Sequence, residues 1–302
     1  MPRQQTWLIT GASSGLGRAL TEAALRRGDI VAAAARRTEA LSDLARGWPQ
    51  RLSCHRLDVT NATALEPAVA EVLAEHGRID VLVNNAGRAH VGAVEETSDA
   101  VLRELMELHL FGPAALVRAV LPHMRERGSG TIVQMSSMAA AHVKTGFSAY
   151  SASKAALDAY SMILQAEVRQ FGIDVLIVEP GSHRTSAFAP GILDTQPGMA
   201  EYAPLLADVR SYVSAANGNQ PGDPGRAADL IIELVDTPQR PARLTLGIDA
   251  VFAIRQVLTA RLAELDAWAE TSARSARPDA PSAEELARRH SGGKGAQPDE
   301  GR

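Results

Sequence analysis

A tyrosine and a lysine four residues apart, Tyr150 and Lys154, are the residues of this chain whose types and spacing most directly suggest chemistry. On a helix these two positions share one face, so the lysine ammonium is expected to lie near the phenol. A neighbouring cation favours the phenolate and so lowers a phenol pKa that starts at about 10. A tyrosine tuned in this way can donate and accept protons near neutral pH. The isolated pair also fits a half-buried tyrosine beside a solvated lysine, so the rest of the chain must decide between the two.

A glycine-rich segment, Thr10-Gly11-Ala12-Ser13-Ser14-Gly15-Leu16-Gly17, follows a short apolar stretch and opens a helical pattern. Glycines in such a turn permit a tight bend, let the backbone approach a phosphate and let helix and strand pack closely. The helix N-terminus then presents free N–H groups and positive potential to a pyrophosphate. The spacing is Gly-x-x-x-Gly-x-Gly rather than the common Gly-x-Gly-x-x-Gly. The flanking strand and helix therefore carry the prediction of a dinucleotide site, with a purely structural turn as the alternative.

The stretch after the second predicted strand indicates which dinucleotide binds. An NAD site normally carries an acidic residue there to bind the adenosine ribose. This chain instead has Arg36 and Arg37 after residues 31–35, with no acid. Guanidinium groups suit a 2′-phosphate because they make paired, charge-assisted hydrogen bonds. We therefore predict NADP(H) over NAD(H); the alternatives are arginines that only solvate the strand end and an NAD-dependent alcohol dehydrogenase.

Short apolar runs alternate with longer helical patterns over most of the chain. The runs are continuously apolar, as expected of parallel strands covered on both faces. Alternation of this kind predicts right-handed crossovers and a Rossmann-type, doubly wound parallel α/β sheet in a single domain. The expected strands are Trp7–Thr10, Ile30–Ala35, Ile79–Val83, Thr131–Met135 and Val175–Val178, with Leu52–Leu57 and Leu244–Leu246 weaker; the expected helices are Gly15–Arg27, Ala62–His76, Asp99–Arg127 (capped by Ser98 or Asp99) and Ser151–Phe171.

Two regions depart from this alternation. Residues 182–226 are rich in Gly, Pro and small polar residues, and an insertion of that length within a domain is usually functional or mobile. From Thr271 onward Ser, Pro, Gly and charged residues dominate, which favours a disordered tail over residues 271–302. The domain is accordingly expected to span residues 1–270, with residues 182–226 as a substrate-loop insertion.

Composition excludes several classes of function. The 302 residues carry a net charge of −4 with scattered basic residues and only 4% aromatics, which gives no reason to expect nucleic-acid or anionic-membrane binding. No apolar run approaches the ~20 residues that cross a bilayer, and the N-terminus lacks a signal peptide's apolar region. The single cysteine, Cys54, suits a reducing compartment, so a cytoplasmic protein is expected.

No metal site is expected from the sequence. His90, His142 and His183 have no metal-ligand spacing with a second His, Cys or acid. Glu66, Glu71 and Glu75 fit solvated charges on a helix.

Taken together, these segments resemble the short-chain dehydrogenase/reductase family in its compact single-domain branch, over about Trp7 to Gly181. Ser137 stands thirteen residues before Tyr150, which is the serine-to-tyrosine spacing of that family. The other matching motifs are the glycine-rich turn, Asp58-Val59 at the adenine end, Asn84-Asn85-Ala86-Gly87 after the fourth strand, and Glu179-Pro180-Gly181 followed by Thr185 at the nicotinamide end.

The resemblance implies a role for each matching residue. Tyr150 would pass a proton to or from the substrate oxygen, Lys154 would lower the tyrosine pKa and hold ribose hydroxyls, and Ser137 would hydrogen-bond the same oxygen. The implied cofactor-binding residues are Gly11, Ser13, Ser14, Gly15, Leu16, Gly17, Arg36, Arg37, Asp58, Val59, Asn85, Ala86, Gly87, Tyr150, Lys154, Pro180, Gly181, His183 and Thr185.

One position departs from the family pattern. Where the family often has asparagine, in a context like Asn-x-x-Gly, this chain has His109. The resemblance implies that this site anchors a water in a proton relay behind the lysine. Histidine keeps the relay if the backbone carbonyl does the anchoring, and alters it if the asparagine side chain is needed. His109 could also carry protons itself, or be a tolerated substitution packed behind the site.

The sequence thus predicts an NADP(H)-dependent carbonyl reductase or alcohol dehydrogenase acting on a small-molecule carbonyl or alcohol. Ala139, Val143, Phe147, Phe188 and Met199 suggest a moderately apolar pocket. The resemblance further implies a homodimer or homotetramer. The rival functions are an epimerase or dehydratase of the extended branch, which has another glycine spacing and a larger C-terminal domain, and a non-catalytic NADP(H)-binding sensor. The intact Ser137, Tyr150 and Lys154 argue against a sensor, since a sensor needs none of them.

Overall fold

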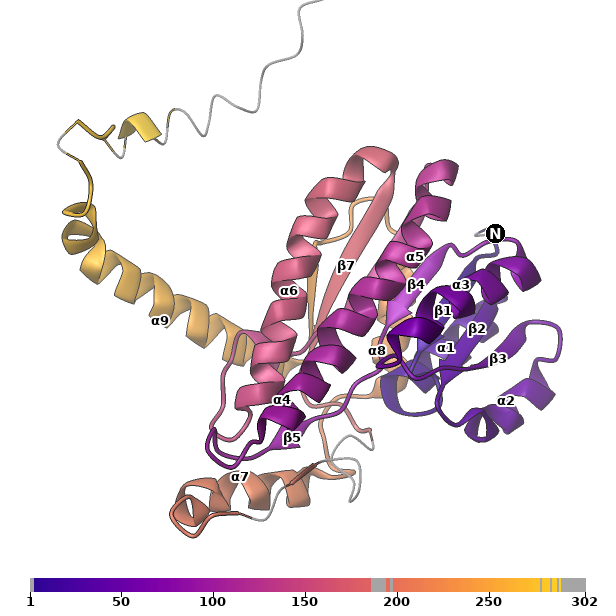
Figure 1. Cartoon of the computed structure of the whole chain (residues 1–302), viewed down its shortest axis with the longest axis horizontal. Helices are drawn as coiled ribbons and strands as arrows, with labels where there is room; N and C mark the ends of the chain where they lie inside the picture. Colours follow the sequence, from indigo (N-terminus) through magenta and orange to yellow (C-terminus); the bar gives the residue numbers. More distant parts are fainter. Residues whose placement is uncertain are drawn as a thin grey trace, which may run out of the picture. The chain divides into compact units, whose positions relative to one another are not determined.

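Seven parallel strands form one sheet in the computed structural model, which describes residues 3–185, 194–195, 198–277, 279–282, 284–286 and 288 (Figure 1). The strand order is β3-β2-β1-β4-β6-β7-β9, so the order reverses between β1 and β4. Ligands of doubly wound sheets bind where the order reverses, outside the carboxyl ends of the strands. The strands are β1 (Thr6–Thr10), β2 (Ile30–Ala35), β3 (Leu52–Arg56), β4 (Val81–Asn84), β6 (Gly130–Met135), β7 (Ile173–Pro180) and β9 (Arg243–Leu246).

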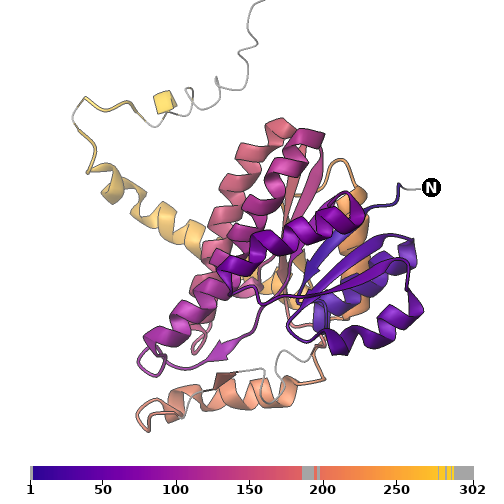
Figure 2. The same cartoon turned by 45° about the vertical axis from the view of Figure 1, so that its right-hand side comes forward.

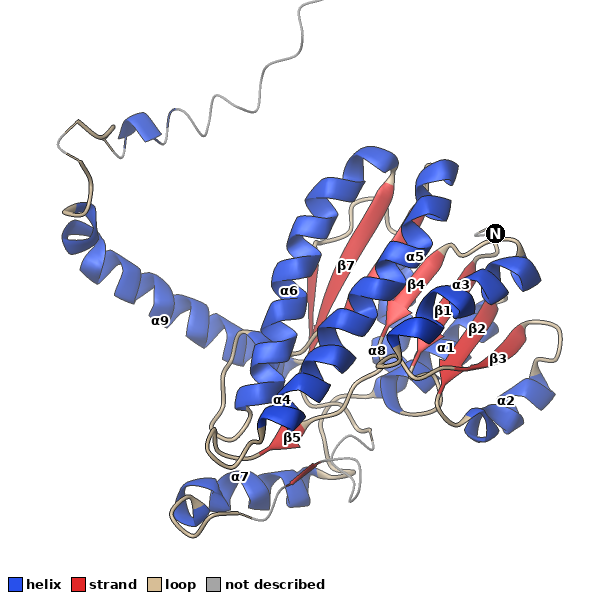
Figure 3. Cartoon of the chain, viewed as in Figure 1, coloured by secondary structure: helices blue, strands red, loops and turns tan. Residues whose placement is uncertain are grey.

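Helices cover both faces of this sheet (Figure 3). Successive strand residues point to opposite faces, so Trp7 packs in a cluster with α1 (Gly15–Arg27) and α8 (Pro224–Asp236). Leu8 packs on the other face, in a cluster with α3 (Ala62–His76), α5 (Gly112–Arg127) and α6 (Ser148–Val168). Both clusters are fully buried cores, which is why the strands read as continuously apolar. The predicted doubly wound α/β fold is confirmed.

Most predicted elements appear close to their expected bounds, with one informative difference. The predicted helix over 99–127 is divided into α4 (Asp99–Met106), a π-helical turn η2 (Glu107–Phe111) and α5. His109 lies in that turn and is buried. The Ser98 hydroxyl accepts a hydrogen bond from the Val101 N–H at 3.3 Å, so Ser98 is the cap. A π-turn inside a long helix commonly marks a functional position.

The same stretch, Asp99–Arg127, is long and apolar enough to cross a membrane by length and composition, which the expectation of no such run did not foresee. Its apolar residues Leu105, Leu116, Val120 and Met124 are fully buried within the protein. Burial inside the protein therefore accounts for part of the apolar composition of this segment, whereas Leu102 and Phe111 are exposed.

Several elements were not indicated by the sequence pattern. They are η1 (Thr38–Leu41), α2 (Ser42–Gly47), β5 (His90–Val91), η3 (Met138–Ala140), β8 (Asp194–Thr195), α7 (Ala203–Ala216), α8 and α9 (Ile248–Ala273), whereas η4 (Arg169–Phe171) ends the helix that was expected over Ser151–Phe171. In the predicted insertion 182–226, β8 pairs with β5, and Figure 2 shows helix α7 beside this small sheet. The buried Val209 and Val213 of α7 pack against Val91 and Phe147. The insertion is thereby joined to the segments that follow β4 and β6.

The chain divides into a compact unit, residues 1–255, and a second unit, residues 256–302. The boundary lies within α9, whereas the sequence places the end of the domain at residue 270. Helix α9 runs on to Ala273, so the start of the predicted disordered tail is helical. The prediction for residues 289–302 lies outside the described residues.

Candidate active site

A cavity of about 810 Å³ opens at the carboxyl edge of the sheet, where the strand order reverses. Its walls come from the segments after β1, β2, β3, β4, β6 and β7 and from helix α6. Almost all of the predicted site residues line it: Gly11, Ser13, Ser14, Gly15, Leu16, Arg36, Arg37, Asp58, Val59, Asn85, Ala86, Gly87, His109, Ser137, Tyr150, Lys154, Pro180, Gly181, His183 and Thr185. Gly17 is the exception, because it is buried beneath the turn.

The glycine-rich turn is fixed by hydrogen bonds from the segment after β4. The Thr10 hydroxyl donates to the Val83 carbonyl at 3.2 Å and accepts from the backbone N–H groups of Asn85 and Ala86 at 2.9 and 3.1 Å. The Asn85 amide donates to the carbonyls of Thr10 and Gly11 at 2.9 and 3.3 Å. Two motifs that are 75 residues apart in the chain are thus one rigid unit. Asn84 points elsewhere and donates to Gln134.

Backbone geometry explains the glycines of this turn. Gly11 has φ +64°, which side chains disfavour. A Cβ at Gly17 would lie 2.4 Å from both the Asn85 amide nitrogen and the Gly11 carbonyl oxygen. The N-cap residue Ser14 makes no side-chain cap hydrogen bond to the first turn of α1. The N–H groups at this helix end therefore face a cradle that suits a pyrophosphate, so the residues present fit a dinucleotide.

The two arginines after β2 and the acid after β3 lie at one end of the cavity. Arg36 and Arg37 are exposed and line its wall. The Asp58 carboxylate is held by the Thr60 N–H at 3.0 Å and the Thr60 hydroxyl at 2.8 Å. Two guanidinium groups and one fixed carboxylate therefore lie at the end of the cavity that would hold the adenosine part of a dinucleotide.

The serine, tyrosine and lysine meet at the other end of the cavity. Ser137 follows β6, and its hydroxyl accepts from the Ala139 N–H at 3.1 Å. Tyr150 and Lys154 lie one turn apart in α6, and the Lys154 ammonium donates to the Met135 carbonyl at 2.8 Å. The lysine is thereby tied to the strand that carries Ser137.

Burial dominates the proton affinities of this pair. It raises the pKa of Tyr150 above 10, with the hydrogen bond from Ser137 opposing, so the phenol keeps its proton at neutral pH. Burial also lowers the pKa of Lys154 to about 8, with Asp158 opposing. The expected lowering of the tyrosine pKa is therefore not found in the protein by itself: burial raises this pKa, and the opposing influence comes from the Ser137 hydrogen bond rather than from Lys154.

His109 lies next to Tyr150, and hydrogen bonds fix its ring. Its Nε2 accepts from the backbone N–H of Arg88 at 3.3 Å, which leaves the ring proton on Nδ1. Nδ1–H then donates to the Ser153 hydroxyl at 2.8 Å, and that hydroxyl donates to the Tyr150 carbonyl at 2.8 Å. The imidazole also meets the Tyr150 ring edge-on at 5.6 Å. Burial, followed by Lys154, holds the pKa of His109 well below its usual 6.5, so the ring is neutral. This arrangement favours a packed, positioning residue over a proton carrier.

The segment after β7 closes the cavity. The Asp249 carboxylate accepts from the Ser182 N–H at 2.7 Å, and a Cβ at Gly181 would lie 2.3 Å from it, so only glycine fits there. The His183 ring hydrogen-bonds the Gly181 carbonyl at 3.1 Å and packs on Gly222. Thr185 lies against Gly15 at the start of α1.

The expected substrate-pocket residues divide into three groups. Ala139 and Phe147 line the cavity. Val143 and Met199 are not among its lining residues: Val143 is exposed, and the Met199 N–H is bound to Glu96. Phe188 lies outside the described residues.

Several lining residues were not singled out individually in the sequence. Tyr212 and Gln220 belong to the predicted substrate-loop insertion 182–226, whereas Arg88, Met138, His142 and Lys144 lie in the segments that follow β4 and β6. Lys144 and Tyr212 meet at 4.0 Å as a cation–π pair, although they lie in a loop and in helix α7. No local pattern distinguishes them, because only the fold brings α7 to the cavity.

Comparison with known proteins gives consistent matches. Residues 5–195 match the family model described as short chain dehydrogenase. A crystal structure of a short-chain dehydrogenase from Streptomyces avermitilis is 49% identical, with a TM-score of 0.86, and the match covers 91% of this chain and 100% of that chain. Oxidoreductase BOA17 of Botryotinia fuckeliana (strain B05.10) is 34% identical over 89% of this chain and 98% of that protein. An alcohol dehydrogenase from Thermococcus sibiricus, complexed with 5-hydroxy-NADP, is 25% identical with a TM-score of 0.66 over 81% of this chain and 96% of that chain.

Proposed function

Because the chain belongs to the short-chain dehydrogenase/reductase family of oxidoreductases, we propose that it interconverts a carbonyl and a secondary alcohol with NADP(H). The observation that carries this proposal is the meeting of Ser137, Tyr150 and Lys154 in the cavity that also holds the glycine-rich turn. A non-catalytic dinucleotide sensor would need the turn but not the three polar side chains.

The cofactor site is assigned to residues at the edge of the sheet. The turn Gly11–Gly15 and the first N–H groups of α1 would hold the pyrophosphate, and Asp58 the adenine end. Arg36 and Arg37 would bind the 2′-phosphate, as in a site built for NADPH rather than NADH. Pro180, Gly181 and Thr185 would hold the nicotinamide end. When bound, the cofactor supplies the hydride.

We assign to Tyr150 the role of general acid, which donates a proton to the substrate oxygen. Its raised pKa keeps the phenol protonated at neutral pH, as a donor to a carbonyl oxygen must be. The Ser137 hydroxyl would stabilise the negative charge that develops on that oxygen. The Lys154 ammonium has three donors, of which the Met135 carbonyl takes one. The remaining donors would bind ribose hydroxyls and stabilise the phenolate left after transfer. His109 would hold the Tyr150 turn in position.

The substrate is proposed to be a small or medium carbonyl compound with an apolar body. Ala89, Met138, Ala139 and Phe147 line the cavity with apolar surface, and Lys144 with Tyr212 forms a polar part of its wall. A cytoplasmic location and a homodimer or homotetramer are part of the same proposal and rest on the sequence analysis.

The test is NADPH consumption across a panel of ketones and aldehydes, with Tyr150→Phe measured beside the wild type. We expect the variant to lose at least ~1000-fold in turnover, since it lacks the proton donor, while NADPH binding stays largely intact. Turnover that survives the substitution would remove Tyr150 as the acid. Tight NADPH binding without turnover on any substrate would favour the sensor.

A further inference from the structure

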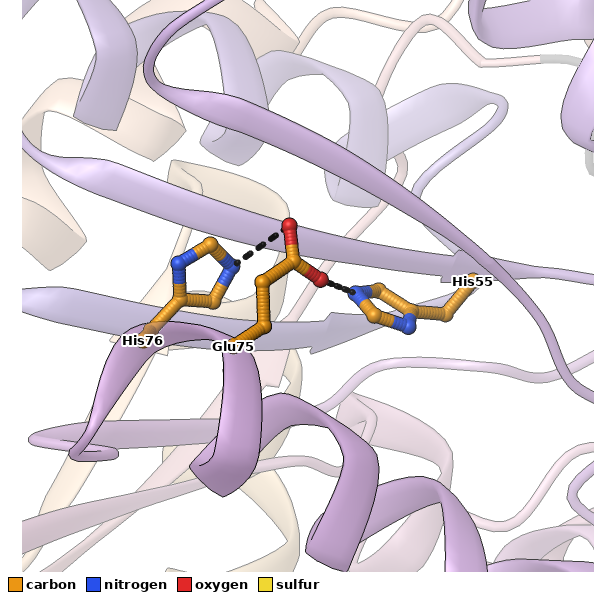
Figure 4. A group of neighbouring side chains, drawn as sticks. All are labelled: His55, Glu75 and His76. Atoms are coloured by element: carbon orange, nitrogen blue, oxygen red, sulfur yellow. Dashed lines mark ion pairs between the residues drawn. The ribbon is translucent and has the colours of Figure 1, made fainter.

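Two histidines and a glutamate converge beside β3, one of the two edge strands of the sheet (Figure 4). His55 lies on β3, and Glu75 and His76 end helix α3. One ligand atom from each of these three residues lies within 4.8 Å of the others. The group is not among the residues that line the active-site cavity, and the proposed reaction does not use it.

The distances within this group are close to those of a metal site. The Glu75 carboxylate lies between the two rings, 3.6 Å from the His55 Nε2 and 3.7 Å from the His76 Nε2. These contacts are too long for hydrogen bonds. Zinc bonds of about 2.0–2.2 Å in a tetrahedron place ligand atoms about 3.3–3.5 Å apart. The two contacts use different carboxylate oxygens, Oε2 toward His55 and Oε1 toward His76, so a small rotation of the exposed Glu75 side chain together with a contraction of a few tenths of an ångström would bring the three residues to a common ion.

A hydroxyl supplies the fourth donor. The Ser53 Oγ lies 2.8 Å from the Nε2 atoms of both His55 and His76. Both nitrogens therefore point at one place. Without an ion the hydroxyl can donate its proton to one of these nitrogens and accept from the N–H of the other. A cation would instead bind the lone pairs of both nitrogens, with both rings in the tautomer that carries its proton on Nδ1.

A second carboxylate, that of Glu71, lies near the other ring nitrogen of His55. The Glu71 carboxylate, one helical turn before Glu75, lies 3.7 Å from the Nδ1 of His55. This contact is also too long for a hydrogen bond, but the Glu71 side chain is exposed and free to move closer, and a carboxylate that hydrogen-bonds the outer nitrogen of a ligating imidazole orients the ring and raises its basicity. Glu71 and Glu75 together also offset the charge of a divalent cation.

The histidines of this group are buried, whereas its glutamates are exposed. The side chains of His55 and His76 are only 5% and 13% exposed, whereas those of Glu75 and Glu71 are 47% and 70% exposed. The imidazoles are thus held in place by packing, and the carboxylates face water, from which an ion can enter.

We propose that His55, Glu75 and His76, with the Ser53 hydroxyl, form a binding site for a divalent zinc-class ion that joins the edge strand β3 to the end of α3. Imidazole nitrogens with a carboxylate are donors that zinc accepts in proteins. The ion would close a loop over the 20 residues between His55 and His76. It would stabilise the fold and leave the active-site residues untouched.

The test uses the full chain, without a histidine tag, titrated with Zn²⁺ and with Co²⁺ as a spectroscopic probe. We expect one equivalent to bind, with the strong visible absorption of tetrahedral Co²⁺. Zinc at about a hundred times its dissociation constant is expected to raise the thermal midpoint by about 5 °C. His76→Ala and Glu75→Gln are expected to weaken binding at least tenfold, and Glu71→Gln by about tenfold.

Matched variants make the result specific. His123→Ala removes a helical histidine from α5 and should leave binding unchanged, as should Cys54→Ser, which removes the exposed thiol beside His55. Circular dichroism without metal checks that each variant folds. The absence of a one-to-one Co²⁺ complex in the folded wild type would overturn the proposal. Equal affinities in wild type, His76→Ala and Glu75→Gln would also overturn it, because they would show an adventitious ion only.

Discussion

We predict that the buried Lys154 ammonium lowers the free energy of unfolding of this protein. Its ammonium is buried, and burial lowers its pKa from 10.5 to about 8, with Asp158 opposing. Each pKa unit is worth about 1.4 kcal/mol, so at pH 7 the buried charge costs about 3 kcal/mol of folding free energy. Lys154→Met removes this cost. It also removes the hydrogen bond from the charged ammonium to the Met135 carbonyl, worth about 1.5 kcal/mol. The variant should therefore be about 2 kcal/mol more stable than wild type at pH 7.

The sign of the pH dependence follows from the same pKa. Between pH 8 and 10.5 the unfolded chain holds a proton on this lysine that the folded chain has released, so the wild type gains stability as pH rises. At about pH 9.5 the remaining cost is about 1.4 kcal/mol. The advantage of Lys154→Met should then shrink from about 2 kcal/mol to near zero.

Urea unfolding of both proteins at the two pH values, followed by circular dichroism, measures this difference. Lys144→Met is the matched control, because Lys144 is exposed, and its effect should stay below about 1 kcal/mol at both pH values. We also expect Lys154→Met to abolish turnover. A variant that is less stable than wild type at pH 7, or an advantage that does not shrink with pH, would refute the reasoning.

Three further predictions concern the rest of the site. Replacing Arg36 and Arg37 with Ala should weaken NADPH binding by about 10- to 100-fold and NADH binding less than threefold, as measured by fluorescence titration, and an equal effect on both would exclude 2′-phosphate recognition. Gly17→Ala should cost about 1–3 kcal/mol and at least tenfold in NADPH affinity, because its Cβ would lie 2.4 Å from the Asn85 amide nitrogen and the Gly11 carbonyl. Gly47→Ala, whose Cβ meets nothing within 4 Å, is its control in the same unfolding and titration experiments. His109→Asn should retain or raise turnover while lowering stability by about 1–3 kcal/mol, and a collapse of activity in a folded variant would show that the histidine is required.

The doubly wound fold could be predicted because its signals are local. Helices α1 and α3 have the predicted bounds, since apolar periodicity along a single segment decides which residues a helix buries. The glycine turn was equally readable, because a backbone with φ +64° at Gly11 demands glycine wherever the turn is used. The spacing between Ser137 and Tyr150 added the reactive side chains through resemblance to a known family.

Other features depended on contacts between distant segments, which no local pattern encodes. The direction of the Tyr150 pKa shift differs from the one expected from the sequence, because desolvation depends on which residues cover the phenol, and no local pattern shows that. The state of His109 was decided by the Arg88 N–H and Ser153, which fix its tautomer across a π-turn that the helical pattern concealed. Helix α7 and its Tyr212 reach the cavity only through the fold. His55 and His76 meet for the same reason: the sequence determines which residues each element buries, and the packing of β3 against α3 decides which of them face one another.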